Sequence, residues 1–198
     1  MKKYLLLLAL PFFLLGCNDD DTPKKTKAES MTILSYLVAN NNLDDDLLAN
    51  IGAMYDGLAA MNKPATLLVY WDGSGSYGDW ENPVVLRYTT DGYGNVNGQQ
   101  ALPQDATVEE VVALAEVVKE YPSQLSVDKN VMTQVLNDMI SYSPTSRFGL
   151  IAASHGSAWT NSIFMSRSLT RSFGQDGKGT DNTMLIKDMA DAMKATGT

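Results

Sequence analysis

Short apolar runs bounded by polar residues recur along this sequence and predict buried strands. The three clearest runs cover residues 31–39 (MTILSYLVA), 66–71 (TLLVYW) and 148–154 (FGLIAAS). Strands that are apolar at consecutive positions are typical of a parallel sheet covered on both faces. A shorter run at residues 84–88 is flanked by glycines, so it predicts a hairpin excursion from that sheet.

Between these runs the apolar residues return at helical spacing. Five of them predict one face of a helix that starts after the first strand: Leu43, Leu47, Ile51, Met54 and Leu58. Asn42 is in position to cap this helix, and the aspartates at residues 44–46 fall in its first turn, where the helix dipole favours anions.

Three more helices are expected, over residues 108–118, 128–142 and 184–194, the first of them capped by Thr107. Strands that alternate with helices predict an α/β fold, here a three-layer sandwich with a mostly parallel sheet. A crossover helix must return the chain to the sheet, yet no strand follows the last predicted helix before Thr198. The pattern therefore predicts a sheet that is incomplete at its C-terminal end.

The composition narrows the possible functions. The 198 residues include 15 basic and 23 acidic side chains, a formal net charge of −8, and this acidity argues against binding to the phosphates of a nucleic acid. A single cysteine and a single histidine exclude an internal disulfide framework, cysteine-rich zinc sites and sites with several histidine ligands. The residues therefore predict no metal site.

Residues 1–16 predict a bacterial lipoprotein signal peptide. Two lysines precede an apolar stretch over residues 4–15, which has the length of a signal-peptide core and is too short to span a membrane. The stretch leads into Leu-Leu-Gly-Cys, which resembles a lipobox, so we expect Cys17 to be lipidated. Residues 17–30 then form a polar tether, in which the acidic run at 18–21 fits either a surface-export signal or a plain spacer. We expect a lipid anchor at the outer membrane or the cell surface.

Polar residues follow the predicted strands where a parallel α/β sheet binds its ligands, at the carboxyl ends of the strands. His155 follows the third run, beside Gly156, while Asn40 and Asp72 end the first two runs. We expect Gly156 to let the backbone turn sharply and to expose an N–H group. A lone histidine is commonly structural, so catalysis and a structural role both remain open for His155 on these residues alone.

Two other chemistries are disfavoured. A triad of the histidine with Asp72 and either Ser154 or Ser157 is opposed by the opposite orientation of adjacent strand side chains and by the lack of a G-x-S-x-G elbow. Residues 44–46 and 176–181 could attract calcium, but neither has the spacing of an EF-hand. Helix capping and a solvated loop are the preferred interpretations of these two acidic segments.

Four blocks of the sequence resemble the clostripain-like family of cysteine peptidases: residues 33–47 (ILSYLVANNNLDDDL), 67–73 (LLVYWDG), 148–159 (FGLIAASHGSAW) and 171–176 (RSFGQD). The resemblance implies a caspase-like fold, a His–Cys dyad, cleavage of peptide or protein substrates after Arg or Lys and, in some members, stimulation by calcium. It matches His155 to the dyad histidine and Gly156 to the oxyanion-hole glycine.

The nucleophile of that family matches no residue of this sequence. Cys17 lies far from His155 along the chain and is expected to carry lipid, and the family's cysteine strand would begin shortly after Thr198. We therefore interpret residues 31–198 as the N-terminal part of a clostripain-like peptidase domain that is inactive alone. The alternatives left open are a non-catalytic cell-surface lipoprotein that binds peptide or glycan, and a structural anchor for a larger assembly.

Members of this family often mature by internal cleavage, and three basic residues are candidate processing sites: Arg167, Arg171 and Lys178. They lie in a stretch rich in Gly, Ser and Thr, between the histidine strand and the expected cysteine strand. We expect a completed chain to be cut after one of the three.

Overall fold

The computed structural model describes residues 30–73, 80–157, 172–177 and 182–196. Its strands are β1 (Met31–Ala39), β2 (Ala65–Gly73), β3 (Val84–Thr90), β4 (Asn95–Val96), β5 (Gln99–Gln100), β6 (Glu116–Glu120), β7 (Phe148–Ala153), β8 (Gly156–Ser157), β9 (Ser172–Phe173) and β10 (Met184–Leu185). Its helices are α1 (Asp44–Ala59), α2 (Val108–Ala113), α3 (Lys129–Ser141) and α4 (Ile186–Ala195). None of these helices is long and apolar enough to cross a membrane.

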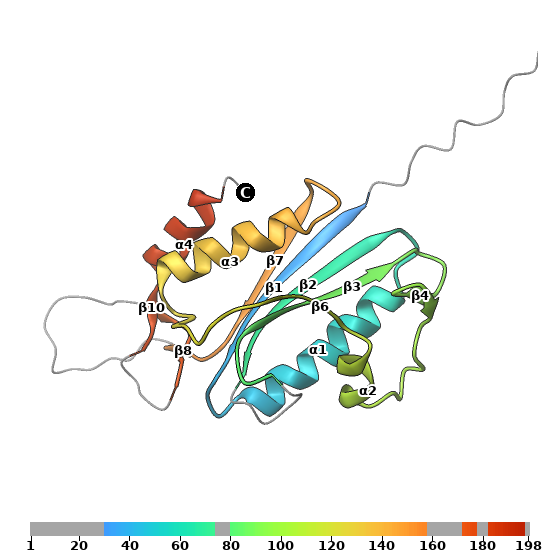
Figure 1. Ribbon diagram of the computed structural model, residues 1–198, viewed down its shortest axis with the longest axis horizontal. Helices are drawn as coiled ribbons and strands as arrows, with labels where there is room; N and C mark the ends of the chain where they lie inside the picture. Colours follow the sequence, from blue (N-terminus) through green and yellow to red (C-terminus); the bar gives the residue numbers. More distant parts are fainter. Residues whose placement is uncertain (1–29, 74–79, 158–171, 178–181, 197–198) are drawn as a thin grey trace, which may run out of the picture.

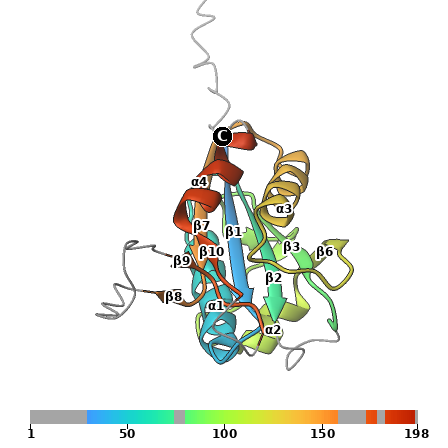
Figure 2. The same ribbon diagram turned by 90° about the vertical axis from the view of Figure 1, so that its left-hand side faces the viewer.

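The main sheet has the order β5-β4-β3-β2-β1-β7, with β6 paired to β3 (Figure 1). Its centre is parallel, because β1 pairs in parallel with both β2 and β7. Strand β3 and its neighbours are antiparallel, as expected for a hairpin excursion. A second, small sheet of order β10-β9-β8 continues from the end of β7 (Figure 2).

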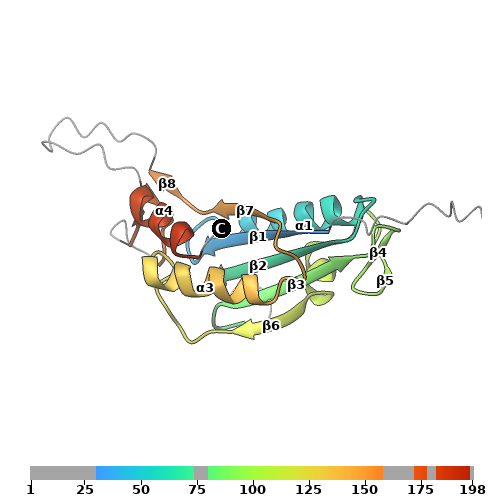
Figure 3. The same cartoon turned by 90° about the horizontal axis from the view of Figure 1, so that it is seen from above.

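Alternate residues of β1 and β2 face two separate cores, one on each side of the sheet. Leu37 and Leu67 pack with residues of α1 and α2, whereas Tyr36 and Tyr70 pack with residues of α3 and α4. Figures 1 and 3 show α1 and α3 on opposite sides of these strands. The predicted three-layer α/β fold with a parallel centre is thereby confirmed.

The predicted helix over residues 108–118 is wrong beyond its first turns. Thr107 caps it as expected, in a capping box with Glu110, but α2 ends at Ala113. The chain then forms β6, which pairs with the outer edge of β3. The β-branched residues Val117 and Val118 suit an extended conformation, and an available strand edge outweighs the weak helical preference of this segment.

The expectation that residues 148–154 are covered on both faces is also wrong. Within the described residues β7 pairs only with β1, so it is an edge strand of the sheet. Its residues are half-buried rather than buried, and the side chain of Ile151 is 42% exposed. An apolar strand that lies at an open edge is a feature that soluble domains normally avoid.

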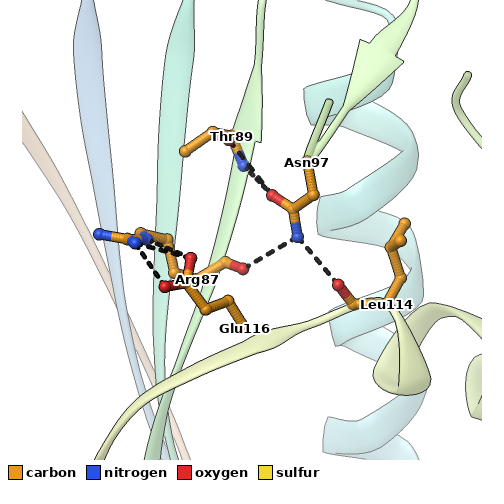
Figure 4. Close-up of polar contacts among 5 residues, drawn as sticks. All are labelled: Arg87, Thr89, Asn97, Leu114 and Glu116. Carbon is orange, nitrogen blue, oxygen red and sulfur yellow. Dashed lines mark hydrogen bonds and ion pairs between the residues drawn. The ribbon is translucent and has the colours of Figure 1, made fainter. Parts of the chain in front are cut away.

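Asn97 connects three segments at the other end of the sheet (Figure 4). It adopts a left-handed backbone conformation with a φ of 51° in the β4–β5 turn. Its Oδ1 accepts a hydrogen bond from the backbone N–H of Thr89 at 2.8 Å, and its Nδ2 donates to the carbonyl of Leu114 at 2.9 Å. Asn97 therefore links β3, this turn and the end of α2.

We expect Asn97→Ala to lower the free energy of unfolding by about 2–3 kcal/mol, because it removes these side-chain bonds and strains the left-handed backbone. Asn97→Gly should lower it by only about 1–2 kcal/mol, since glycine tolerates the positive φ. Urea denaturation of the two variants measures the difference. Equal losses would show that the backbone conformation contributes nothing.

Candidate functional site

The carboxyl ends of the three parallel strands meet at one edge of the sheet, as the sequence predicted. The asparagines at residues 40–42 follow β1, Asp72 lies at the end of β2, and His155 comes two residues after β7. The register pairs Val38 with Asp72 and Leu37 with Ala153, so the three strand ends lie at the same height.

His155 is held at this edge through both its ring and its backbone. Its Nε2 lies 2.7 Å from Oδ1 of Asn42. Its carbonyl oxygen accepts a hydrogen bond from the N–H of Gly174 at 2.7 Å. The ring is partly accessible to solvent.

Gly156 belongs to β8, where it pairs with Phe173 of β9. It is therefore in a short strand rather than at a sharp left-handed turn, and it is not one of the described residues that have a positive φ. It is exposed, and a Cβ at this position would meet no atom within 4 Å. The absence of a side chain leaves the backbone next to His155 open to an approaching ligand.

The three asparagines after β1 bond to two segments: Asn40 and Asn41 to residues 175–176, and Asn42 to His155. The side chain of Asn41 accepts a hydrogen bond from the N–H of Leu43 at 2.9 Å and donates to the carbonyl of Gln175 at 2.7 Å. Asn40 donates to Oδ1 of Asp176 at 3.0 Å. Asn42 was expected to cap α1, and this is wrong, because α1 has no side-chain cap and Asn42 reaches His155 instead.

A buried polar cluster joins β2 to the segment that follows β9. Asp72 and Asp176 are each 4% exposed, and Ser126 between them is fully buried. The hydroxyl of Ser126 donates to the Asp72 carboxylate, while its backbone N–H donates to Oδ2 of Asp176 at 2.6 Å. The hydroxyl of Tyr70 bonds to the Ser126 hydroxyl at 2.6 Å, and that of Tyr36 donates to the Ser126 carbonyl at 2.8 Å.

Burial is the main reason why the pKa of Asp72 is raised to about 7. The hydrogen bond from Ser126 opposes this rise, and the negative charge of Asp176 adds to it. Because Asp176 is buried, the expectation that it belongs to a solvated loop is wrong. Sequence reasoning had no signal for this, since the partner Ser126 lies 50 residues away along the chain.

The structure does not assemble a serine-protease triad from Ser154, His155 and Asp72. The hydroxyl of Ser154 donates to the carbonyl of Val38 at 2.7 Å. The carboxylate of Asp72 is bonded to Ser126, and the ring of His155 to Asn42. Each group is therefore engaged elsewhere. The side chain of Ser157 lies outside the described residues.

Among the described residues, no three His, Cys, Asp or Glu side chains gather as possible metal ligands. The aspartates at residues 44–46 are in the first turn of α1, as expected for residues that favour the helix dipole. Asp176 is occupied by Ser126 and Asn40. Cys17, Arg167, Arg171 and Lys178 lie outside the described residues.

Several parts of the site were not predicted from the sequence: Asn41, Asn42, Ser126 and the segment 172–177. The run of three asparagines directly after a buried strand was the one available signal, because amide side chains at a strand end can bond to neighbouring loops. Nothing in the sequence alone assigns each of the three to its own partner.

Comparison with known proteins identifies a protein family that matches this chain. The family model of the clostripain family matches residues 35–198. One similar solved structure is a secreted C11 cysteine protease of Bacteroides thetaiotaomicron in complex with an irreversible peptide inhibitor, 27% identical, with a TM-score of 0.53. The match covers 84% of this chain and 39% of that one.

A second structure, the secreted C11 cysteine protease iotapain of the same organism, is 15% identical with a TM-score of 0.53, which supports the fold alone. The match covers 86% of this chain and 44% of that one. This chain therefore spans less than half the length of either relative. No match was found among curated proteins.

Proposed function

This chain belongs to the clostripain family, and on that basis we propose that it is the histidine-bearing part of a cysteine endopeptidase. The observation that supports this most strongly is His155, held at the carboxyl end of β7 with its ring bonded to Asn42. In the proposed reaction a thiol gives its proton to the imidazole, and the thiolate attacks the scissile carbonyl carbon. The imidazolium then returns the proton to the leaving amine as the C–N bond breaks.

The proposed substrates are peptides or proteins cleaved after Arg or Lys, as the family resemblance implies. The N–H of Gly156 would donate a hydrogen bond to the oxyanion that forms on the carbonyl oxygen. The open space around Gly156 supports this role, because a substrate carbonyl can approach its backbone without displacing a side chain.

We further propose that the thiol comes from polypeptide outside residues 1–198. Cys17 is the only cysteine of the sequence, and a lipidated sulfur cannot act as a nucleophile. The open edge of β7 is where an additional strand would pair, and such a strand would lie directly beside His155. A clostripain-like cysteine strand in that place would bring its thiol to the same sheet edge.

A cavity next to β7 supports the same arrangement. It has a volume of about 210 Å³ and lies between β7 and the helices α3 and α4. Its lining is almost wholly apolar: Leu34, Leu136, Ile140, Phe148, Leu150, Met193 and Thr196. Apolar side chains of an added strand would fill this cavity and cover Ile151. The apolar surface buried in this way would stabilise the pairing of the added strand with β7.

The genomic DNA beyond codon 198 tests the proposal in all reading frames. An Asp-Ala-Cys-type segment preceded by aliphatic residues would support the peptidase. A clean stop followed by unrelated sequence would instead favour a non-catalytic surface lipoprotein that binds peptide or glycan through the same strand ends.

The proposed location is the outer membrane or the cell surface, reached through a lipid on Cys17. Because two or three acyl chains hold a protein stably on a membrane, Cys17→Ser should move most of the protein from the membrane fraction to the soluble fraction. Asn18→Ser is the matched control and should remain in the membrane fraction. Unchanged partitioning of Cys17→Ser after cell fractionation would contradict the lipid anchor.

A completed chain should be cut after Arg167, Arg171 or Lys178, and the pieces should stay together. After a cut at Arg167 or Arg171, the two sides are joined by the β8–β9 pairing and by the bond from Gly174 to His155. After a cut at Lys178, they are joined by the β9–β10 pairing. Intact mass should therefore show two fragments under denaturing conditions, while native size-exclusion chromatography shows one species. An active enzyme that remains a single chain would count against cleavage.

A further inference from the structure

The bond between Asn42 and His155 determines which ring nitrogen carries the proton. Oδ1 of an amide has lone pairs and no hydrogen, so it can only accept a hydrogen bond. With Oδ1 of Asn42 facing the ring, as it does in this structure, the nitrogen 2.7 Å away, Nε2 of His155, is the one that donates the hydrogen of this contact. In the neutral ring the remaining lone pair is then on Nδ1.

We propose that Asn42 is a positioning residue that holds His155 as the Nε2–H tautomer, so that Nδ1 is the nitrogen that exchanges a proton with the nucleophile. This inference rests on the proposed peptidase function only for the identity of the nucleophile. It assigns to Asn42 a task that the His–Cys pair does not itself include.

The backbone around both residues is fixed, which leaves ring rotation as the main freedom of His155. On one side, the side chain of Asn41 bonds to Leu43 and Gln175, which restrains the backbone next to Asn42. On the other side, Gly174 bonds to the carbonyl of His155. The Asn42 side chain restrains the rotation that remains, because a flipped ring would lose its acceptor.

The direction of the free lone pair follows from this restraint. With Nε2 committed to Asn42, only Nδ1 can accept a thiol proton and leave a thiolate behind. The same Nδ1–H then protonates the leaving amine, while the Nε2–H bond to Asn42 persists through both steps. Asn42 therefore stabilises the neutral and the protonated ring in one orientation.

A structural role alone does not account for this bond. Asn42 is exposed and His155 only partly buried, and a hydrogen bond between such groups contributes little to the stability of a fold. Asn42 also makes no cap for α1, whose N-cap position is Leu43. Its removal should therefore alter the ring and leave the fold in place.

Nitrogen NMR of the imidazole tests the proposal directly. His155 is the only histidine of the chain, so the spectrum of ¹⁵N-labelled protein contains one imidazole. At a pH where the ring is neutral we expect protonated Nε2 and unprotonated Nδ1. Asn42→Ala should give a mixture of both tautomers, whereas Asn42→Asp keeps an acceptor oxygen and should retain the Nε2–H form.

Asn50→Ala is the matched control, because Asn50 is an exposed asparagine on α1, and it should leave the tautomer unchanged. Magic-angle-spinning spectra of precipitated protein give the same readout if the chain is poorly soluble. A wild-type ring protonated at Nδ1, or an unchanged tautomer in Asn42→Ala, would overturn the proposal. Neither NMR measurement needs a thiol or catalytic turnover. A failure of the proposed peptidase function would therefore appear only in activity assays and would leave the tautomer result unaffected.

A second readout uses the completed enzyme. Asn42→Ala should lower kcat by about 10–100-fold, with KM changed little, because the base is misoriented in part of the molecules while binding is intact. Asn42→Asp should recover most of this loss. A loss in both variants that parallels a fall in thermal stability would assign Asn42 a structural role and overturn the proposal.

Discussion

Residues 1–198 alone should show no detectable cleavage after arginine or lysine. A completed chain should cleave the same substrates at a rate at least about a thousandfold above any residual rate of residues 1–198. The first reason is chemical. Removal of a nucleophile typically lowers the rate by several orders of magnitude, and Cys17 is the only thiol of the sequence. His155 has no proton to accept where no thiol is near.

The second reason is structural. The exposed edge of β7 and the apolar cavity beside it favour association between copies of the chain. We expect the isolated chain to be poorly soluble or loosely packed, and a peptide that carries the cysteine strand to restore both folding and activity. Fluorogenic peptide assays together with light scattering measure the two effects on the same samples.

Two variants of the completed chain make this test specific. His155→Ala should abolish the restored activity, while Tyr93→Ala should retain it, because Tyr93 is 89% exposed and far from the strand ends in sequence. Thiol-dependent cleavage by a purified and well-folded 1–198 chain would show that the nucleophile has been assigned wrongly.

The stability of the fold should fall as the pH rises from about 5.5 to about 8. The pKa of Asp72 is raised to about 7 by burial in the folded protein and returns to its ordinary value when the chain unfolds. The folded state therefore binds more protons than the unfolded state in this range, and stability is lost as pH increases. The expected loss is about 2 kcal/mol, at about 1.36 kcal/mol for each unit below the folded pKa.

Four polar groups lie around the carboxyl of Asp72, and the titration of Asp72 is tested with two variants. The four groups are the Ser126 hydroxyl, the Asp176 carboxylate and the hydroxyls of Tyr70 and Tyr36. Asp72→Asn keeps the shape without the charge and should flatten the dependence on pH. His155→Gln, which removes the only imidazole of the chain, should keep the slope. Urea denaturation at several pH values compares the variants, and a slope that persists in Asp72→Asn would exclude Asp72 as its source.

The sequence was most informative where one pattern dominated a whole element. Strand β1 covers residues 31–39 as predicted, and α3 covers Lys129–Ser141 within the predicted range 128–142, because apolar periodicity is a local property of the sequence. It was least informative for α2 and β6, where the edge of β3 decided the conformation of two valines. Pairing with a distant strand leaves no signature in the segment that responds to it.

Some residues of the site could likewise be predicted from the sequence, and others could not. His155 and Asp72 could be placed at one sheet edge from the positions of the strand ends. The partners of Asn42 and Asp176 could not, because they depend on contacts between segments 113 and 50 residues apart. Helix capping is the common role of an asparagine before a helix, and here a long-range bond replaced it.

The pairing of β8 with β9 has a consequence for how members of this lineage can differ in length. Gly156 faces Phe173 and Ser157 faces Ser172, so the joint is closed before residue 158 and after residue 171, whatever sequence connects the two sides. Because the entropy of closing a loop grows only slowly with its length, insertions here should be tolerated more readily than at most other positions. We therefore expect related genes to vary in length at this joint, and reporter tags to be accepted there.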